Sequence, residues 1–154
     1  MPTPTSLETL LRQVGEAWSS PDEASSLILR VLKEYPDEEE AFVAAYRYYF
    51  YRNDLPSALH IAEQCLSRIQ HELNFPLDWR QIEPGNIDFA EPNRPRHRFF
   101  LFSLNAYAYL LARLGRNTDA DQAFAVVSRL DPTDKIGAAR LQAVLRRGPD
   151  ADTD

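Results

Sequence analysis

The chain has 154 residues, of which 44% are hydrophobic, 26% are charged and five are glycine. This length and composition are ordinary for one globular domain with its own buried core, and they exclude a fibrous or wholly disordered class. The formal net charge of -6 argues against general nucleic-acid binding, which needs a basic surface.

The charge is unevenly spread along the chain. Residues 1–40 hold three basic and nine acidic side chains, whereas residues 101–147 hold seven basic and four acidic ones. The two ends of the chain thus carry opposite net charge. Such a charge asymmetry can steer a partner or a second copy of the chain, although a solvated surface with no role is the commoner explanation. Self-association therefore stays open.

Cysteine usage and hydropathy bear on the compartment. The single Cys65 excludes an intramolecular disulfide. The opening residues show neither the basic region nor the apolar run of an export signal, and no stretch approaches the roughly 20 apolar residues of a membrane span. We expect a cytoplasmic protein without a membrane partner.

Helical periodicity runs through the first third of the chain. Ser20-Pro21-Asp22-Glu23 predicts a capping box with proline at the first helical position, and the apolar pattern that follows ends at Tyr35-Pro36. The acidic run 37–40 favours the next helix start. A metal site there is the weaker alternative, because the acidic residues are consecutive and lack the glycine turn of a binding loop.

The next helical pair is rich in aromatic residues. The helix predicted over 41–51 carries aromatic side chains around much of its circumference, more than burial on one side requires. Asn53-Asp54-Leu55-Pro56 predicts a turn. The inner face of the helix after it consists of Ala58, Ile61, Ala62, Cys65, Leu66 and Ile69.

The segment over about 73–98 breaks the helical pattern. Loops longer than about 12 to 15 residues are usually functional or disordered, and this one is too apolar for disorder. Leu73, Phe75, Leu77 and Trp79 alternate with polar or imino residues, so we expect an extended, docked segment anchored by Phe75 and Trp79. Either it lies along a binding groove or, more plainly, it covers an apolar strip.

The stretch from Phe99 to Pro132 contains two apolar-periodic runs separated by Leu114-Gly115-Arg116-Asn117-Thr118. This pattern predicts a helix, a tight turn and a second helix. Thr133 or Asp134 can then cap a last helix with basic residues on its outer side. Residues 148–154 are expected to form a disordered acidic tail.

The signature positions of this last hairpin are Leu104, Tyr107, Ala108, Leu111, Gly115, Ala120, Phe124, Val127 and Pro132. Their spacing resembles the tetratricopeptide repeat, a helical hairpin of about 34 residues. Placing Ala24, Ala58 and Ala120 at one shared position gives three copies, although Glu8, Arg12 and Gly15 depart from the family pattern in the first. The copies cover about 5–38, 39–72 and 101–134.

The resemblance implies the fold. It is an all-α, right-handed superhelix of three tetratricopeptide-like hairpins, with an irregular insertion over about 73–98 between the second and the third. A capping helix over about 134–147 would close it, making one domain over 5–147. Tyr46 stands where the repeat usually has a small residue.

In this family, ligands usually lie on the concave surface made by the first helices. Carried over by resemblance, the partner-binding positions are Arg47, Phe50, Tyr51, Phe102, Asn105, Tyr109 and Arg113. Aromatic side chains and arginine suit a peptide or protein segment, including one with acidic groups. The carboxylate-clamp subclass fits poorly, since Thr9 and Gln13 replace its lysine and asparagine. Alternatively, these aromatic residues only pack against the insertion or neighbouring helices.

Other candidate sites are weaker. Arg94, Arg96, His97 and Arg98 form a basic cluster that could hold an acidic group but is more often solvated. His60 and His71 are eleven residues apart, too distant to share a metal ion. Cys65 occupies a small inner position and has no evident base beside it.

These observations lead to one functional expectation. We expect no catalytic residues, no cofactor and no metal site, and we expect a protein-protein interaction module. A small assembly or secretion chaperone, or an accessory regulatory subunit of an enzyme, is the alternative, since fold alone does not fix function.

Overall fold

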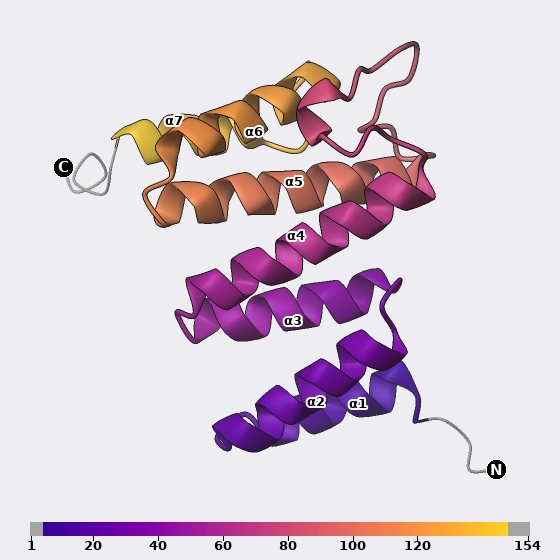
Figure 1. Ribbon diagram of the computed structural model, residues 1–154, viewed down its shortest axis with the longest axis vertical. Coiled ribbons are helices and arrows are strands. Elements are labelled where there is room, and N and C mark those ends of the chain that lie inside the picture. Colours follow the sequence, from indigo (N-terminus) through magenta and orange to yellow (C-terminus); the bar gives the residue numbers. More distant parts are fainter. Residues whose placement is uncertain (1–4, 148–154) are drawn as a thin grey trace. The chain divides into compact units, whose positions relative to one another are not determined.

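The computed structural model describes residues 5–147, and within this range every regular element is a helix (Figure 1). In chain order they are α1 (Leu7–Glu16), α2 (Pro21–Glu34), α3 (Glu39–Tyr51), α4 (Leu55–Glu72), the 3-10 turn η1 (Trp79–Gln81), α5 (Pro95–Arg113), α6 (Asn117–Leu130) and α7 (Ala138–Arg147). The expectation of an all-α fold is confirmed. The tail predicted over 148–154 lies outside the described residues.

The chain divides into two compact units, residues 1–61 and residues 62–154. The boundary falls inside α4, so this helix contributes its first turns to unit 1 and its remaining turns to unit 2. Unit 1 therefore contains α1, α2, α3 and the start of α4. The rest of α4, the insertion and α5, α6 and α7 belong to unit 2.

Unit 1 opens with the helix pair α1 and α2. Ser6 caps α1, because its hydroxyl accepts a hydrogen bond from the main-chain N–H of Thr9 at 3.2 Å. Pro21 stands at the start of α2 as predicted, but the capping box does not form. The Ser20 side chain makes no capping hydrogen bond, and it is the Ser20 carbonyl that accepts from the N–H of Ala24.

Helix α3 completes the core of unit 1. The buried cluster consists of Val14, Ala17, Ala24, Ile28, Ala45, Tyr48 and Ile61. Phe42 and Tyr49 lie partly buried against it. Tyr48, which the repeat pattern does not single out, is only 2% exposed and is the most buried aromatic side chain of α3.

The turn between α3 and α4 has the predicted chemistry. Asn53 takes the left-handed conformation, with φ at 59°, which asparagine tolerates better than most residues. Asp54 then accepts a hydrogen bond from the N–H of Ser57 at 3.2 Å through its side chain. This contact satisfies an amide in the first turn of α4. Asn53 therefore reverses the chain, and Asp54 caps the helix that follows.

Helices α5 and α6 form the central hairpin of unit 2 and run side by side (Figure 1). Gly115 makes the turn with φ at 80°, a left-handed value that a residue with a Cβ adopts at a cost. Helix α5 begins at Pro95, so residues 95–98 are helical. The expectation that the irregular insertion extends to about residue 98 is therefore wrong. Proline suits this first position, because the missing N–H would have no helical partner.

The last helix begins later than predicted, at Ala138 instead of about 134. The residues before it form a loop held by Asp131, which is 2% exposed and accepts hydrogen bonds from the N–H groups of Lys135 at 3.0 Å and Ile136 at 2.8 Å. Asp134 and Gly137 have positive φ, which is incompatible with a helix. Asp134 still acts on α7, accepting from the N–H of Ala139 at 3.0 Å.

Candidate functional site

The seven predicted contact residues fall in both units. Arg47, Phe50 and Tyr51 lie on α3 in unit 1, and the other four lie on α5 in unit 2. Within each unit they come from one helix, which fixes the spacing of each set.

On α3 the predicted residues continue into an aromatic row. Phe50 stacks on Tyr46 with ring centroids 5.9 Å apart, and Tyr46 lies 6.0 Å from Phe42. Phe50 also meets the ring of Tyr51 edge-on at 5.7 Å. The Tyr51 side chain is 68% exposed. Tyr46 thus joins the contact set that the sequence indicated, and its four-residue spacing from Phe42 and Phe50 is the signal that could have found it.

A second aromatic group in unit 1 is structural. The Tyr48 hydroxyl lies 2.9 Å from the Ser25 hydroxyl and donates to the Pro21 carbonyl at 3.2 Å. The Arg52 guanidinium lies 4.7 Å from the Tyr48 ring and 5.2 Å from the Trp18 ring, and it donates to the Trp18 carbonyl. These contacts tie the end of α3 to α2 and to the turn between α1 and α2, so they hold in place the helix that presents the predicted residues.

On α5 the predicted residues lie in one stripe, and Arg98 extends it by one turn. The spacing 98, 102, 105, 109, 113 places all five on one side of a helix. The Arg98 guanidinium lies 5.8 Å from the Phe102 ring centroid, and the Arg113 guanidinium lies 5.6 Å from that of Tyr109. Arg113 also donates to the Tyr109 hydroxyl at 2.8 Å. We call Arg98, Phe102, Asn105, Tyr109 and Arg113 the α5 stripe.

The α5 stripe is basic and only partly satisfied. Helix α5 has no aspartate or glutamate among its residues. The Nε of Arg98 and the Oδ1 of Asn105 are buried and have no hydrogen-bond partner among the described residues. Phe102 is 49% exposed. An unpaired buried acceptor or donor costs free energy, so these two atoms are the points at which the helix can gain most from a ligand.

The insertion docks within unit 2 and not as a simple extended strand. Trp79 is 9% exposed and meets the Tyr107 ring of α5 edge-on, with centroids 6.2 Å apart. Phe75 stacks on Phe89 at 5.5 Å. Both predicted anchors are therefore in packing contacts. The expected alternation is wrong at Leu77, which is 94% exposed, because Trp79 sits in the turn η1 and not in an extended run.

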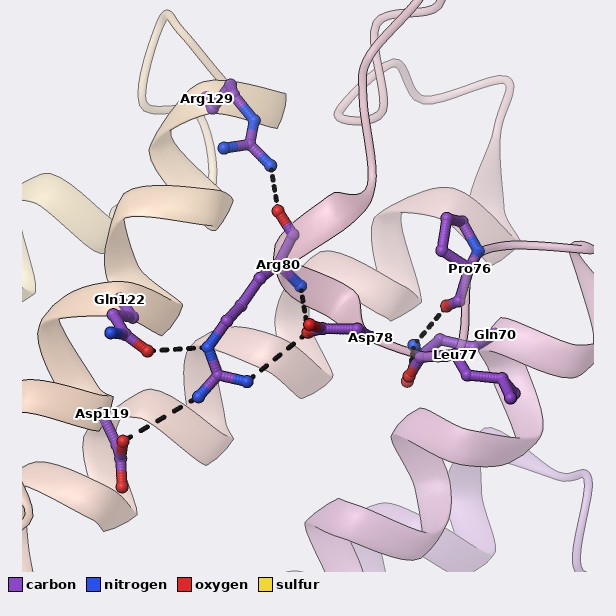
Figure 2. A network of polar contacts seen from close by, with 8 residues as sticks. All are labelled: Gln70, Pro76, Leu77, Asp78, Arg80, Asp119, Gln122 and Arg129. Carbon is purple, nitrogen blue, oxygen red and sulfur yellow. Dashed lines mark hydrogen bonds and ion pairs between the residues drawn. The ribbon is translucent and has the colours of Figure 1, made fainter.

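Polar contacts from buried and charged residues fix the insertion in place (Figure 2). Gln70 of α4 donates to the carbonyls of Pro76 at 2.9 Å and Leu77 at 3.0 Å. Arg80 donates to the Gln122 side chain at 2.7 Å and lies 3.8 Å from Asp119, both on α6. These contacts join the insertion to α4, which precedes it, and to α6, the second helix after it.

Arg129 and Lys135 hold the far part of the insertion. Arg129 donates to the carbonyls of Ile82 at 2.7 Å and Arg80 at 3.1 Å. Lys135 lies 3.0 Å from the Asp88 carboxylate, and this hydrogen bond lowers the pKa of Asp88. No local sequence pattern indicates these pairs, since their members are 47 or more residues apart.

The basic cluster at the start of α5 is not simply solvated. Arg96 forms a two-pronged contact with Glu72, with both hydrogen bonds at 2.8 Å. His97 lies between aromatic rings, 5.0 Å from Phe89 and 5.7 Å from Phe75. Burial, and next the nearby Arg94 charge, lower the pKa of His97.

The remaining candidates show no assembled chemistry. His60 and His71 are exposed, and the Cys65 thiol lies 3.5 Å from the Ser103 hydroxyl. Among residues 5–147, no three His, Cys, Asp or Glu side chains are placed to hold a metal ion. No helix in that range has both the length and the apolarity needed to cross a membrane. Burial, followed by the charge of Glu63, raises the pKa of the Tyr107 phenol.

Comparison with known proteins adds one relative. No protein-family model matches the chain, and no solved structure matches it. The chain is 29% identical over 144 residues to a protein of Azotobacter chroococcum mcd 1 described as an uncharacterized 19.8 kDa protein in the nifW 5' region. The aligned part covers 90% of this chain and 81% of that protein, so the likeness includes residues of both units.

Proposed function

We propose that this chain is a non-catalytic protein-interaction module of the tetratricopeptide-like class, and that it binds a peptide or protein segment through the first helices α3 and α5. The hairpins of this proposal are α1–α2, α3–α4 and α5–α6, with α7 as the closing helix. The right-handed superhelix typical of that class is part of the proposal.

One observation carries the proposal. Ala24, Ala58 and Ala120 are each the fourth residue of a second helix, and their exposed fractions are 0%, 0% and 2%. Four residues later Ile28, Ala62 and Phe124 are also buried, at 0%, 0% and 1%. Recurrence of the same buried pair in three second helices supports a repeated hairpin, in which a small residue lets the two helices approach closely.

The exposed side chains support the binding role. Tyr51 on α3 is 68% exposed and Phe102 on α5 is 49% exposed, and arginines lie beside both. Exposed aromatic residues beside arginine are the residue types that dominate protein interfaces. Polar and aromatic contacts within unit 2 account for the docking of the insertion without involving the α5 stripe. This favours the interpretation that the insertion covers an apolar strip, and not that it lies along the binding surface.

Capture from the native cell tests this proposal. A tagged copy is expected to copurify with a defined polypeptide, identified by mass spectrometry, and Tyr109→Ala with Arg113→Ala is expected to abolish its recovery. Arg146→Ala on α7 is the matched control and is expected to retain the partner. Full retention by the double variant would contradict a role for α5. Stoichiometry then separates the alternatives, because a chaperone releases its client whereas a subunit stays with its enzyme.

A further inference from the structure

We infer that the α5 stripe binds an extended acidic segment that carries two carboxylates about five or six residues apart. The inference rests on the proposed function and adds the chemistry and spacing of the ligand. Its starting point is the symmetry of the stripe. Arg98 with Phe102 and Tyr109 with Arg113 are two arginine–aromatic pairs, each four residues apart, and Asn105 lies between them.

The start of α5 shows which charge lacks a counterpart. Three basic residues follow Pro95 in the first turn, where a positive charge opposes the helix dipole. Arg96 is paired with Glu72, and the lowered pKa of His97 favours its neutral form. Arg98 is partly buried, and among residues 5–147 its side chain makes no hydrogen bond or ion pair; its guanidinium lies over the Phe102 ring. A partly buried cation without an anion beside it is poorly compensated, so Arg98 is the basic residue of this turn that gains most from a negative group on a ligand.

The middle of the stripe calls for a hydrogen-bond donor. The Oδ1 of Asn105 is buried without a partner. A polypeptide main chain in an extended conformation presents an unpaired N–H group to each side at alternate residues, which is the donor that an asparagine oxygen accepts. The requirement at Asn105 favours a polypeptide over a free anion.

The spacing follows from helix geometry. Residues 98 and 113 are 15 positions apart, which corresponds to about 22 Å along a helix axis. Arg113 folds back over Tyr109, so the two guanidinium groups lie closer together than that. An extended chain advances about 3.3 Å per residue, so two carboxylates that reach both arginines lie about five or six positions apart in the ligand.

Fluorescence anisotropy with the full chain and labelled ten-residue peptides tests the inference. The first peptide has glutamates at positions 3 and 8 in a glycine–serine–phenylalanine background. The second has glutamines there, and the third has adjacent glutamates at positions 5 and 6. The first peptide is expected to bind about tenfold more tightly than either of the others, and its affinity is expected to fall as salt is raised.

Variants assign the contacts. Arg98→Gln and Arg113→Gln are each expected to weaken binding of the first peptide about tenfold, whereas Arg140→Gln on α7 leaves it unchanged. Asn105→Leu is expected to lower affinity without lowering thermal stability, because it removes a buried acceptor that has no partner. Thermal unfolding of each variant shows whether it folds, and Arg98→Lys, which keeps the charge, is expected to lose less affinity than Arg98→Gln.

Three results would overturn the inference. Equal binding of the glutamate and glutamine peptides would remove the acidic preference, and equal binding of the spaced and adjacent peptides would remove the spacing. Absence of binding by every peptide would also refute it. In each case the proposed function would stand if Tyr109→Ala with Arg113→Ala still abolished partner capture, so the two failures are distinguishable.

Discussion

Arg129 on α6 donates a hydrogen bond to the main-chain carbonyl of Ile82, 47 residues earlier, at 2.7 Å. Ile82 is 1% exposed and lies outside the helices, where no helical main-chain N–H is available to its carbonyl. The Arg129 side chain supplies the hydrogen bond instead. The relationship explains how an irregular insertion with three prolines stays ordered on a helical scaffold.

The Arg129 contact predicts a measurable loss of stability. Arg129→Met keeps much of the side-chain packing but removes the donors to the Ile82 and Arg80 carbonyls. We expect the free energy of unfolding to fall by about 1–2 kcal/mol, because a part-buried carbonyl is left unpaired. Denaturant unfolding measures this. Arg146→Met, at an exposed ion pair of 3.9 Å, is the control and should change little.

The two apolar residues of the insertion should behave oppositely. Trp79→Ala removes a side chain that is 9% exposed and also the ring beneath the Arg80 guanidinium, 4.2 Å away. We expect a loss of about 3 kcal/mol in unfolding free energy and faster proteolysis between residues 73 and 94. Leu77→Ala, at a position 94% exposed, should stay within about 0.5 kcal/mol of the natural chain. Equal effects would show that the insertion is not docked as described.

Stability should depend on pH through His97. Its pKa is lowered in the folded state by burial and by Arg94, so the unfolded chain binds the proton more readily. The stabilising contribution is therefore complete above the ordinary pKa of 6.5 and is lost as pH falls below that value.

The comparison of variants isolates this effect. Between pH 7 and pH 5 the melting temperature of the natural chain should fall more steeply than that of His97→Phe, which keeps an aromatic ring beside Phe75 and Phe89. His71→Gln, at an exposed position, should keep the steeper slope. Identical slopes for the natural chain and His97→Phe would refute the assignment.

Two glycines provide a matched test of backbone geometry. Gly115→Ala should destabilise the chain by about 1–2 kcal/mol, because its φ of 80° is left-handed. Gly15→Ala lies inside α1 with nothing within 4 Å of the added carbon, and it should stabilise by about 0.5 kcal/mol. Thermal unfolding distinguishes the two signs. Stabilisation by both substitutions would contradict the turn at Gly115.

Local patterns predicted the helices well. The turn residues Asn53, Asp54 and Gly115 reverse the chain where their conformational preferences indicated, and the inner alanines of the second helices are buried. These features depend on neighbours within a few residues, so their signal lies in short stretches of sequence.

The features that the sequence patterns did not predict depend on contacts between residues far apart in the chain. The start of α7 depends on Asp131, whose carboxylate holds the loop that precedes the helix. Burial of Tyr48 depends on Ser25 and Pro21, which come from another helix. The docking of the insertion depends on Arg80 and Arg129, and neither residue belongs to a recognisable pattern. The sequence indicates only that Arg98 belongs to a charged cluster, and its contact with the Phe102 ring in the structure assigns it to the α5 stripe.

Site-specific photo-crosslinking in the native cell tests the central claim most directly. A photoreactive phenylalanine analogue in place of Phe102, on the α5 stripe, is compared with the same group in place of Val144 on α7; these side chains are 49% and 43% exposed. The account predicts a covalent adduct with one defined polypeptide from position 102 and none from position 144. Adducts of equal yield from both positions, or from position 144 alone, would contradict it.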